Sequence, residues 1–279
     1  MIDNQGHRPL PQGGLNKAQI IYEALTEGGI TRYMAMFWGV APEKIGPVRS
    51  ARHYFVEIAH EYDPIYVHIG GSYFAKEMVA SLGVTDINGL YDQIFWNLTN
   101  DRSNWQDSYT SYDRIKEYAK KKNYSFKTAE KLHFTYSPVM KSLKSKRAVK
   151  ANEVLVRYNS YADNRYVYDS KNKLYLRYRN GSAHMERNSG KQISAGNIIV
   201  QYVSNSSIPN DYKDRQELYL IGHGTGLFIT CGKAVKINWK KDSMNSQTHY
   251  TLQSGKPVVL NPAQTWIQIV PPSLNVVMK

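Results

Sequence analysis

The pattern of hydrophobic residues changes near residue 150, and this change constrains the fold more than any other feature. Before it, stretches with helical spacing alternate with short apolar runs typical of strands, and glycine or proline separates them. After it, strand-like runs dominate, with turn signals such as Asn180-Gly181 between them. We therefore predict an α+β protein, with an N-terminal α/β domain over residues 1–145 and a mostly antiparallel β domain over residues 151–279.

The first half carries helix and strand signals in alternation. Between Leu15 and Glu27 the apolar residues fall on one helical face, and two glycines follow. A serine stands at a helix-cap position after a short apolar run ending at Ile69. We predict helices over Leu15–Glu27, Arg49–Tyr62, Ser72–Leu82 and Ser111–Lys122, and strands over Thr31–Trp38 and Ile65–Ile69.

The second half reads as a series of strands. We predict them at Glu153–Tyr158, Leu174–Tyr178, Asn197–Val203, Glu217–Ile221, Leu227–Cys231, Ala234–Trp239 and Thr265–Val270. The glycine-rich run Gly222 to Gly226 lacks the Lys-Ser/Thr ending and the following helix of a phosphate loop, so it predicts a hairpin turn. The single cysteine, Cys231, lies in an apolar run and is interpreted as a buried structural thiol.

The net charge of +13 is unevenly distributed. Residues 1–112 contain 8 Lys+Arg against 12 Asp+Glu, residues 113–150 contain 12 against 3, and residues 151–279 contain 16 against 8. A basic surface of this kind suits approach to nucleic acid, anionic lipid headgroups or an anionic wall polymer, and charge alone does not choose among them. No apolar run reaches the roughly 18 residues of a membrane span.

Three arginines predict an anion-binding site in the first domain. Arg32 opens the strand Thr31–Trp38, while Arg49 and Arg52 lie three residues apart at a predicted helix start, with Ser50 between them. A helix start offers free backbone N–H groups and a partial positive charge, and guanidinium groups bind oxyanions in a planar fork. Phosphate or carboxylate is therefore the expected ligand chemistry.

The same arginines allow a structural interpretation. Glu23 and Glu27 are one helical turn apart in the predicted helix Leu15–Glu27, where they can serve as ion-pair partners of the arginine cluster. In that case the positive charge is used within the protein. Both interpretations stay open from the sequence, so the two glutamates join the candidate site residues.

A second group of candidate residues follows the predicted strand Ile65–Ile69. His68 ends this strand just before Gly70, Gly71 and Ser72, and ligands of α/β sheets gather at the carboxyl ends of strands. Ser72 is also placed to cap the next helix. A hydrogen-bonded structural histidine is the alternative interpretation of His68.

Other motifs carry less chemistry. The histidines outside this group lack the close-spaced partners of zinc sites, so we expect no metal and no cofactor; they are His7, His60, His133, His184, His223 and His249. Tyrosines alternate with arginines between Arg157 and Arg179, which suits stacking on sugars or bases but also ordinary cross-strand packing.

Several segments resemble the YerB-like family of bacterial lipoproteins. They are EGGITRYMAMFWG, IGPVRSARHYF, EYDPIYVHIGGS, INWKKDS and LNPAQTWIQIVP, and the resemblance covers nearly the whole chain. It implies an extracytoplasmic protein, held at the membrane only through a lipidated cysteine of a longer precursor, since Met1-Ile2-Asp3-Asn4 has no leader. The family has no assigned biochemical role. The chain departs from it at Asn104–Ser108, where a Pro-His-Asn stretch is expected.

These observations lead to three functional hypotheses. The first is a noncatalytic cell-envelope protein that binds an anionic partner: a glycan, a phosphate-bearing wall polymer or an envelope protein. The second is an envelope enzyme that acts on a phosphodiester or a pyrophosphate-linked glycan, with His68 or Glu27 moving a proton. The third is a nucleic-acid-binding protein, ranked last because the arginine cluster lies in the acidic part of the chain.

Overall fold

Two compact units make up the structure, a computed structural model that describes residues 1–101, 103–104, 106–128, 130–132 and 134–279. Within these limits the first unit contains residues 1–18, 32–132 and 185–191, and the second contains residues 19–31, 134–184 and 192–279. The units depart from a single division near residue 150, because residues 19–31 join the second unit and residues 185–191 join the first. Among the described residues, no helix is long and apolar enough to cross a bilayer.

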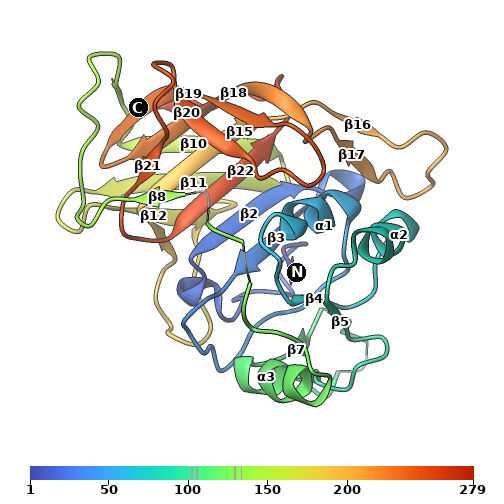
Figure 1. Ribbon diagram of the computed structural model, residues 1–279. Coiled ribbons are helices and arrows are strands. Elements are labelled where there is room, and N and C mark those ends of the chain that lie inside the picture. The colour runs from blue at the N-terminus through green and yellow to red at the C-terminus, as the bar shows by residue number, and fades with distance from the viewer. Residues whose placement is uncertain (102, 105, 129, 133) are drawn as a thin grey trace. The chain divides into compact units, whose positions relative to one another are not determined.

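Three strand pairs and three α-helices organise the described part of the first unit. The helices are α1 (His53–His60), α2 (Tyr73–Leu82) and α3 (Tyr112–Lys121), preceded by the 3₁₀ turn η1 (Leu15–Lys17). The strand pairs are β1 (Ile2–Asp3) with β3 (Thr31–Met36), β4 (Tyr66–His68) with β5 (Asp86–Asn88), and β6 (Trp96–Asn97) with β7 (Ser108–Tyr109). Figure 1 shows α1 beside α2, against which it packs.

The helices begin where local chemistry places them. The hydroxyl of Ser72 accepts a hydrogen bond from the N–H of Ala75 at 3.1 Å, and Ser111 caps α3 in the same way. In α1 seven of the eight residues are buried, as expected for a helix that is mostly apolar around its circumference. The strands β4 and β5 are parallel and α2 connects them in a β-α-β unit, whose second strand was not predicted from the sequence.

The helix predicted to begin at Arg49 begins four residues later. Ala51 is held in an extended bridge with Gly71, and its N–H donates to the carbonyl of Gly70 at 2.9 Å. This main-chain pairing keeps the chain extended up to Arg52, which occupies the N-cap of α1 with φ −130°. Arg49 and Arg52 therefore do not share the first turn of a helix, and this part of the prediction is wrong.

The second unit is built from two sheets. The larger sheet follows the order β2 (Ile20–Leu25), β22 (Thr265–Val270), β15 (Asn197–Tyr202), β18 (Gly222–Thr230), β19 (Lys233–Lys241) and β20 (His249–Leu252), with β9 (Val149–Lys150) also on β19. Its first three strands run parallel and the later pairs are antiparallel. Three short pairs or turns complete the unit: η2 (Glu27–Gly29), β8 (Thr135–Tyr136) with β21 (Val259–Leu260), and β16 (Asn205–Ser207) with β17 (Gln216–Leu218).

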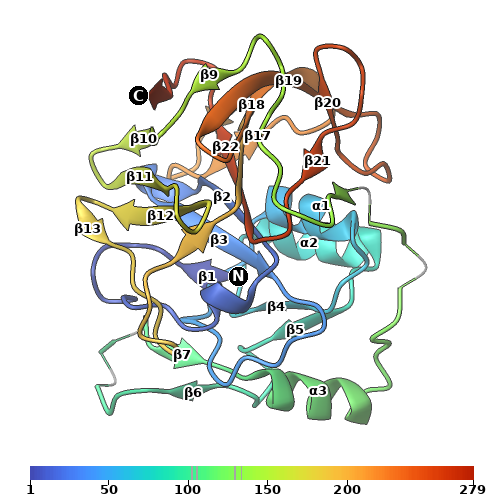
Figure 2. The same ribbon diagram turned by 90° about the vertical axis from the view of Figure 1, so that its left-hand side faces the viewer.

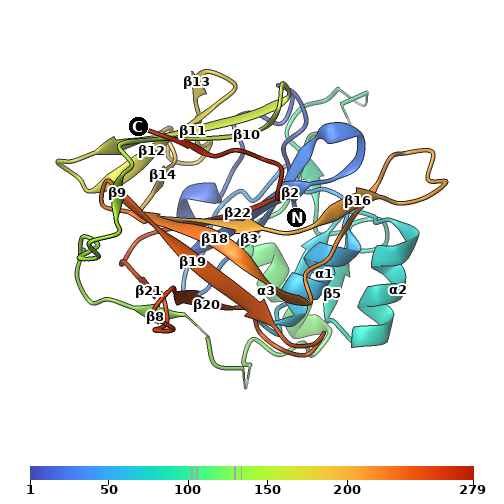
Figure 3. The same cartoon turned by 90° about the horizontal axis from the view of Figure 1, so that it is seen from above.

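The smaller sheet is antiparallel throughout. Its order is β13 (Ser182–Ala183), β12 (Leu174–Arg179), β11 (Ala162–Asp169), β10 (Glu153–Asn159) and β23 (Val277–Met278), with β14 (Ser194–Ala195) on β12. Figure 2 shows β10, β11 and β12 following one another, and Figure 3 shows them as a layer beside β18, β19 and β22. The predicted mostly antiparallel β architecture is thus confirmed.

Two sequence predictions in this unit are wrong. The helix Leu15–Glu27 is replaced by η1 and the strand β2, whose first five residues are all buried because β22 pairs beside it. A strand buried on both faces has no alternation, so its apolar residues imitate a helical face. The run Gly222–Gly226 is likewise strand and not turn: a Cβ on Gly224 would lie 2.6 Å from the indole nitrogen of Trp239, so glycine is required for this close pairing.

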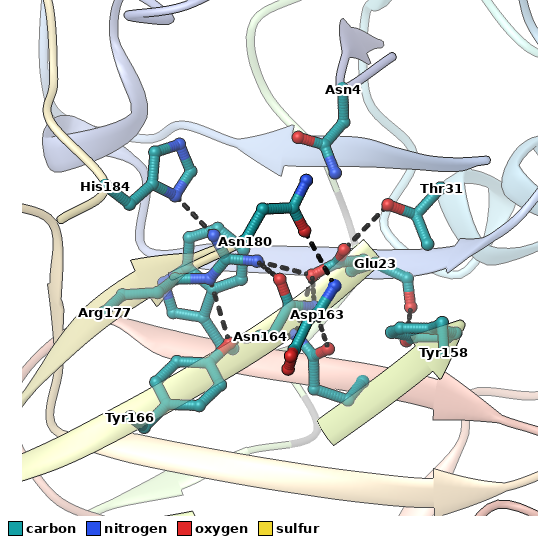
Figure 4. Close-up of polar contacts among 12 residues, drawn as sticks. Asn4, Glu23, Thr31, Tyr158, Asp163, Asn164, Tyr166, Arg177, Asn180 and His184 are labelled. Atoms are coloured by element: carbon teal, nitrogen blue, oxygen red, sulfur yellow. Dashed lines mark hydrogen bonds and ion pairs between the residues drawn. The ribbon is translucent and has the colours of Figure 1, made fainter. Parts of the chain in front are cut away.

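A buried polar cluster joins the two sheets of the second unit (Figure 4). The carboxylate of Glu23 in β2 accepts hydrogen bonds from Arg177 at 2.8 Å and from Asn164 at 3.0 Å, both on the smaller sheet. Glu23 and Arg177 are fully buried. Thr31 donates to the second carboxylate oxygen at 2.8 Å, and Gln268 of β22 donates to the first at 3.1 Å. The charges are therefore compensated inside the sandwich.

Aromatic groups complete the surroundings of the Arg177 guanidinium. It lies 4.2 Å from the centre of the Trp266 ring, and its Nε donates to the hydroxyl of Tyr166 at 3.2 Å. Another N–H donates to Nδ1 of His184. Burial, and then the charges of Arg177 and Arg179, hold the pKa of His184 well below its ordinary value, so this imidazole is neutral and accepts the hydrogen bond.

We predict that Arg177→Met lowers the free energy of unfolding by about 3–5 kcal/mol, because it leaves the Glu23 carboxylate buried without its cation. Glu23→Gln combined with Arg177→Met should cost less than the sum of the single changes. Urea denaturation followed by circular dichroism measures both. Arg157→Met is the control: its guanidinium pairs with Asp163 at 2.9 Å but its side chain is 63% exposed, so we expect a loss below about 1 kcal/mol. Equal losses at the two arginines would contradict the assignment.

We also predict a pH dependence of stability from His184. Because its pKa is lowered in the folded protein, the unfolded chain binds one more proton below a pH of about 6.5. Stability should therefore fall as the pH decreases through that value, by up to about 1.4 kcal/mol per pH unit from this residue. In His184→Asn the carbonyl oxygen of the new side chain can replace Nδ1 as acceptor. The slope of unfolding free energy against pH between 5 and 6.5 should become smaller in this variant, and an unchanged slope would exclude the effect.

Candidate functional site

Main-chain pairing in the first unit brings most of the predicted site residues together. The carbonyl of Arg49 accepts from the N–H of Ile69 at 3.2 Å, and the N–H of Ser72 donates to the carbonyl of Ala51 at 3.3 Å. The segment Arg49–Arg52 therefore lies against the end of β4 and the start of α2. In this way Arg49, Ser50 and Arg52 become neighbours of the second group of candidate residues, His68, Gly70, Gly71 and Ser72.

Two of the three guanidinium groups are buried and bound to carbonyl groups. Arg32 is 1% exposed and donates to the carbonyl of Ser50 at 3.0 Å, while Arg52 is 6% exposed and donates to the carbonyl of Ala51 at 2.6 Å. Arg49 lies nearer the surface and forms an ion pair with Asp3 at 3.2 Å. These contacts stabilise the extended segment before α1, and they give all three arginines partners inside the protein.

The two glutamates of the candidate set lie in the second unit. Glu23 belongs to the buried cluster with Arg177, a partner that the sequence did not indicate. Glu27 begins η2. The tyrosine and arginine alternation is also explained in part by packing, since Tyr166, Tyr175 and Arg177 are fully buried. Two residues of the remaining sequence features lie outside the described residues. They are His133 and Trp105, of which Trp105 belongs to the segment Asn104–Ser108.

His68 is held by hydrogen bonds at both ring nitrogens. Nδ1 lies 2.7 Å from the carbonyl oxygen of Gly70, and Nε2 lies 2.9 Å from a carboxylate oxygen of Asp86. A carbonyl oxygen only accepts, so Nδ1 carries a hydrogen, and Nε2 faces the carboxylate. Asp86 is the less buried partner, with 31% of its side chain exposed.

Asn88 is the second polar residue that β5 presents beside His68. It is opposite His68 in the parallel register and on the same strand face as Asp86, while Ile87 points to the other face and is fully buried. The Oδ1 atom of Asn88 accepts from the N–H of Gly70 at 2.9 Å and from the N–H of Leu90 at 3.1 Å. Among the described residues no acceptor lies within hydrogen-bond distance of its Nδ2, although the residue is only 9% exposed.

A pocket of ≈ 120 Å³ opens in front of these side chains. Asp86, Asn88 and His68 line it from the strands, Lys76 from α2, and Tyr91 from the turn after β5. Small residues complete the wall, namely Ala51, Gly71, Ala75 and Val79. The pocket thus offers the amide donor of Asn88, the ammonium group of Lys76 and the acceptor oxygen of Asp86. It also lies beside the first turn of α2, whose N–H groups have no intrahelical acceptor.

Tyr66 lies behind the pocket, on the same face of β4 as His68. Its ring packs 5.3 Å from the imidazole, and its hydroxyl has no hydrogen-bond partner among the described residues. Burial raises the pKa of Tyr66, against the opposite effect of Arg32 and Arg52. The interior behind β4 therefore leaves this hydroxyl unpaired, whereas Lys76 and Tyr91 line the pocket on its exposed side.

Sequence reasoning missed Lys76, Asp86, Asn88 and Tyr91. A signal for two of them was available: the β-α-β pattern requires a second strand after α2, and its carboxyl end lies beside that of β4. The short run Asp86-Ile87-Asn88 alternates as such a strand does and is followed by Gly89. Lys76 and Tyr91 carry no local signal, because only the fold places them at the pocket.

We predict that the two ends of the Asn88 amide have separable roles. Asn88→Ala removes the acceptor of two backbone N–H groups, and we expect it to lower the free energy of unfolding by about 1–3 kcal/mol. Asn88→Asp keeps an oxygen at the Oδ1 position and should cost clearly less. Asn97→Asp is the matched control for the added charge, since Asn97 is exposed and its Oδ1 also accepts a hydrogen bond, from Ser108. Equal destabilisation by the alanine and aspartate changes would contradict these roles.

Comparison with known proteins places the chain in a family. The description "Protein of unknown function (DUF3048) N-terminal domain" matches residues 1–125, and the DUF3048 C-terminal domain matches residues 153–267. "Putative lipoprotein YerB" of Bacillus subtilis (strain 168) is 36% identical over 279 residues, which cover 97% of this chain and 80% of the relative. The crystal structure of YerB protein from Bacillus subtilis matches with a TM-score of 0.85 at 33% identity, covering 98% of this chain and 91% of that one. The resemblance seen in the sequence is confirmed across both halves, and the chain belongs to the DUF3048 family, together with YerB.

Proposed function

We propose that this protein is a noncatalytic, extracytoplasmic binding protein that recognises an anionic cell-envelope component at the pocket between β4, β5 and α2. The observation that carries the proposal is the side chain of Asn88, which is only 9% exposed and lines the pocket, and whose Nδ2 has no acceptor among the described residues. An amide donor that stays unpaired in such a place costs free energy, so a ligand oxygen is its natural partner.

Lys76 supports an anionic ligand. It is exposed on α2 and lines the pocket, and within the described chain no carboxylate forms an ion pair with it. The first turn of α2 adds backbone N–H groups and a partial positive charge to the same side. The proposal moves the expected anion site from the arginines to the pocket beside them.

The geometry of His68 favours binding over catalysis. Both ring nitrogens already have hydrogen-bond partners, one the Gly70 carbonyl and one Asp86, so exchange of a proton with a substrate requires that one of these contacts be broken. The alternative hypothesis of an envelope enzyme assigned the proton transfer to His68 or Glu27. Glu27 belongs to the second unit, so it provides no support for a base at this pocket.

The relative supports the proposed location. The name of the Bacillus subtilis protein describes a lipoprotein, and this chain matches 80% of its length. We propose that the present protein is likewise exported and anchored through lipid. Its partners are then the components of the envelope, whose polymers carry phosphate and carboxylate groups.

Calorimetric titration with soluble wall fragments tests the proposal. We expect binding of carboxylate-bearing or phosphate-bearing fragments, and we expect Lys76→Met to weaken it by about tenfold through loss of one charge-assisted contact. Lys116→Met is the control, because Lys116 is an exposed lysine on α3 of the same unit. Both variants remove one positive charge, so a general effect of net charge would appear in both.

The outcomes separate the hypotheses. Equal affinities of wild type and Lys76→Met for every anionic fragment would remove the pocket from the function. Turnover of a lipid-linked phosphodiester that is lost in His68→Ala would instead favour the enzyme. High affinity for oligonucleotides that falls steeply with salt and is unchanged in Lys76→Met would favour nucleic acid.

A further inference from the structure

Large exposed apolar side chains lie at one side of the pocket. Leu90 and Tyr91, in the turn after β5, are 57% and 74% exposed. Tyr91 lines the pocket itself. Leu90 lies over Gly70, with its Cδ1 3.3 Å from the position of a Cβ there. Exposed apolar side chains beside a small polar pocket indicate a binding surface larger than the pocket.

The floor of the pocket combines a donor with an acceptor. Nδ2 of Asn88 donates, and the second carboxylate oxygen of Asp86, which is not used by His68, accepts. The two residues lie two positions apart on one strand, roughly 7 Å along its axis. A secondary amide is complementary to this pair, because its carbonyl oxygen accepts from Asn88 and its N–H donates to Asp86. A phosphate or sulfate group satisfies the donor but places oxygen against the Asp86 carboxylate.

The size of the pocket and its rim restrict the molecule that carries the amide. A volume of ≈ 120 Å³ holds an acetamido group, and the sugar ring that carries it can then lie at the opening, against the rim. Tyr91, which lines the pocket and is 74% exposed, presents most of its ring surface there. An aromatic ring beside polar anchors suits the stacking of flat, partly apolar rings. Lys76 stands at the same opening and can reach a carboxylate on the neighbouring sugar.

We propose that the pocket binds the acetamido group of a glycan strand, with its carbonyl oxygen on Asn88 Nδ2 and its N–H on Asp86, while the adjoining sugar ring packs on Tyr91. The proposal rests on the proposed function and names the ligand class within it. The anionic character of the ligand then comes from carboxylate groups on the same strand, which Lys76 contacts. A peptide also contains secondary amides, and it is the competing ligand in the test.

Matched oligosaccharides test the amide. The probes are a tetramer of N-acetylglucosamine, the corresponding tetramer of glucose, and a tetrasaccharide in which N-acetylglucosamine alternates with N-acetylmuramic acid. Calorimetry should show the N-acetylglucosamine tetramer binding at least about tenfold more tightly than the glucose tetramer, which has a hydroxyl in place of each acetamido group. The carboxylate-bearing tetrasaccharide should bind more tightly again, and Lys76→Met should remove only this second gain.

Variants assign the contacts. Asn88→Asp keeps the loop contacts but replaces the donor, so the preference for N-acetylglucosamine over glucose should disappear, whereas Asn97→Asp should retain it. Tyr91→Ala should weaken all three oligosaccharides by about tenfold, since a stacked ring is worth on the order of that factor. Tyr212→Ala, at a tyrosine 86% exposed in the second unit, should not. Thermal unfolding of each variant establishes that it is folded.

The results test the acetamido assignment separately from the proposed binding of an anionic envelope component. If anionic wall fragments bind with dependence on Lys76 but the N-acetylglucosamine and glucose tetramers bind equally, the amide assignment is wrong and the binding function stands. If an acetylated tripeptide amide binds with dependence on Asn88 while no oligosaccharide binds, a peptide ligand replaces the glycan. If none of the probes binds, the function and the inference both fail.

Discussion

The candidate site depends on main-chain hydrogen bonds between two segments, residues 49–51 and residues 69–72. Ala51 is hydrogen-bonded to Gly70 and Ser72, and Arg49 is hydrogen-bonded to Ile69. This pairing holds the chain extended immediately before α1 and leaves carbonyl groups that must find donors in a buried region. Arg32 and Arg52 supply those donors. The arginines that seemed suited to an outside anion thus stabilise the wall on which the pocket is built, and guanidinium groups with carbonyl partners are part of the fold.

The two units use buried polar groups in opposite ways. In the second unit every described group around Arg177 has a partner: Glu23, Asn164, Tyr166 and His184 all contact it, and no donor faces open space. A network that is complete in this way favours one packing of two sheets and offers nothing to a ligand. In the first unit the amide of Asn88 is satisfied only at its oxygen. The proposed function uses this difference, because it assigns the Nδ2 donor of Asn88 to a ligand.

Local chemistry made part of the fold predictable. Ser72 caps α2, and β3 contains the continuous apolar run Tyr33–Met36. The helix and the strand were therefore recognisable from neighbouring residues. The strand β2 was not, because its partner β22 lies more than two hundred residues away and its burial on both faces hides the alternation. The site residues were likewise predictable only where the signal is local. His68 was found because it lies at the end of its own strand. Asp86 and Asn88 lie beside it only because β5 pairs with β4 in this register, which no local pattern predicts.

Register also explains why the pocket has this chemistry. Side chains alternate along β5, so a shift of one residue would bring Ile87 to the pocket and bury Asp86 and Asn88 on the opposite face. Gly89 helps to fix the position, because a Cβ there would lie 2.6 Å from Ile69 and 2.8 Å from the ring of Phe95. The close approach ends β5 at Asn88 and turns the chain, so that Leu90 and Tyr91 emerge at the rim. One glycine therefore links the donor at the floor of the pocket to the apolar side chains beside it, and a larger residue at this position would disturb both together.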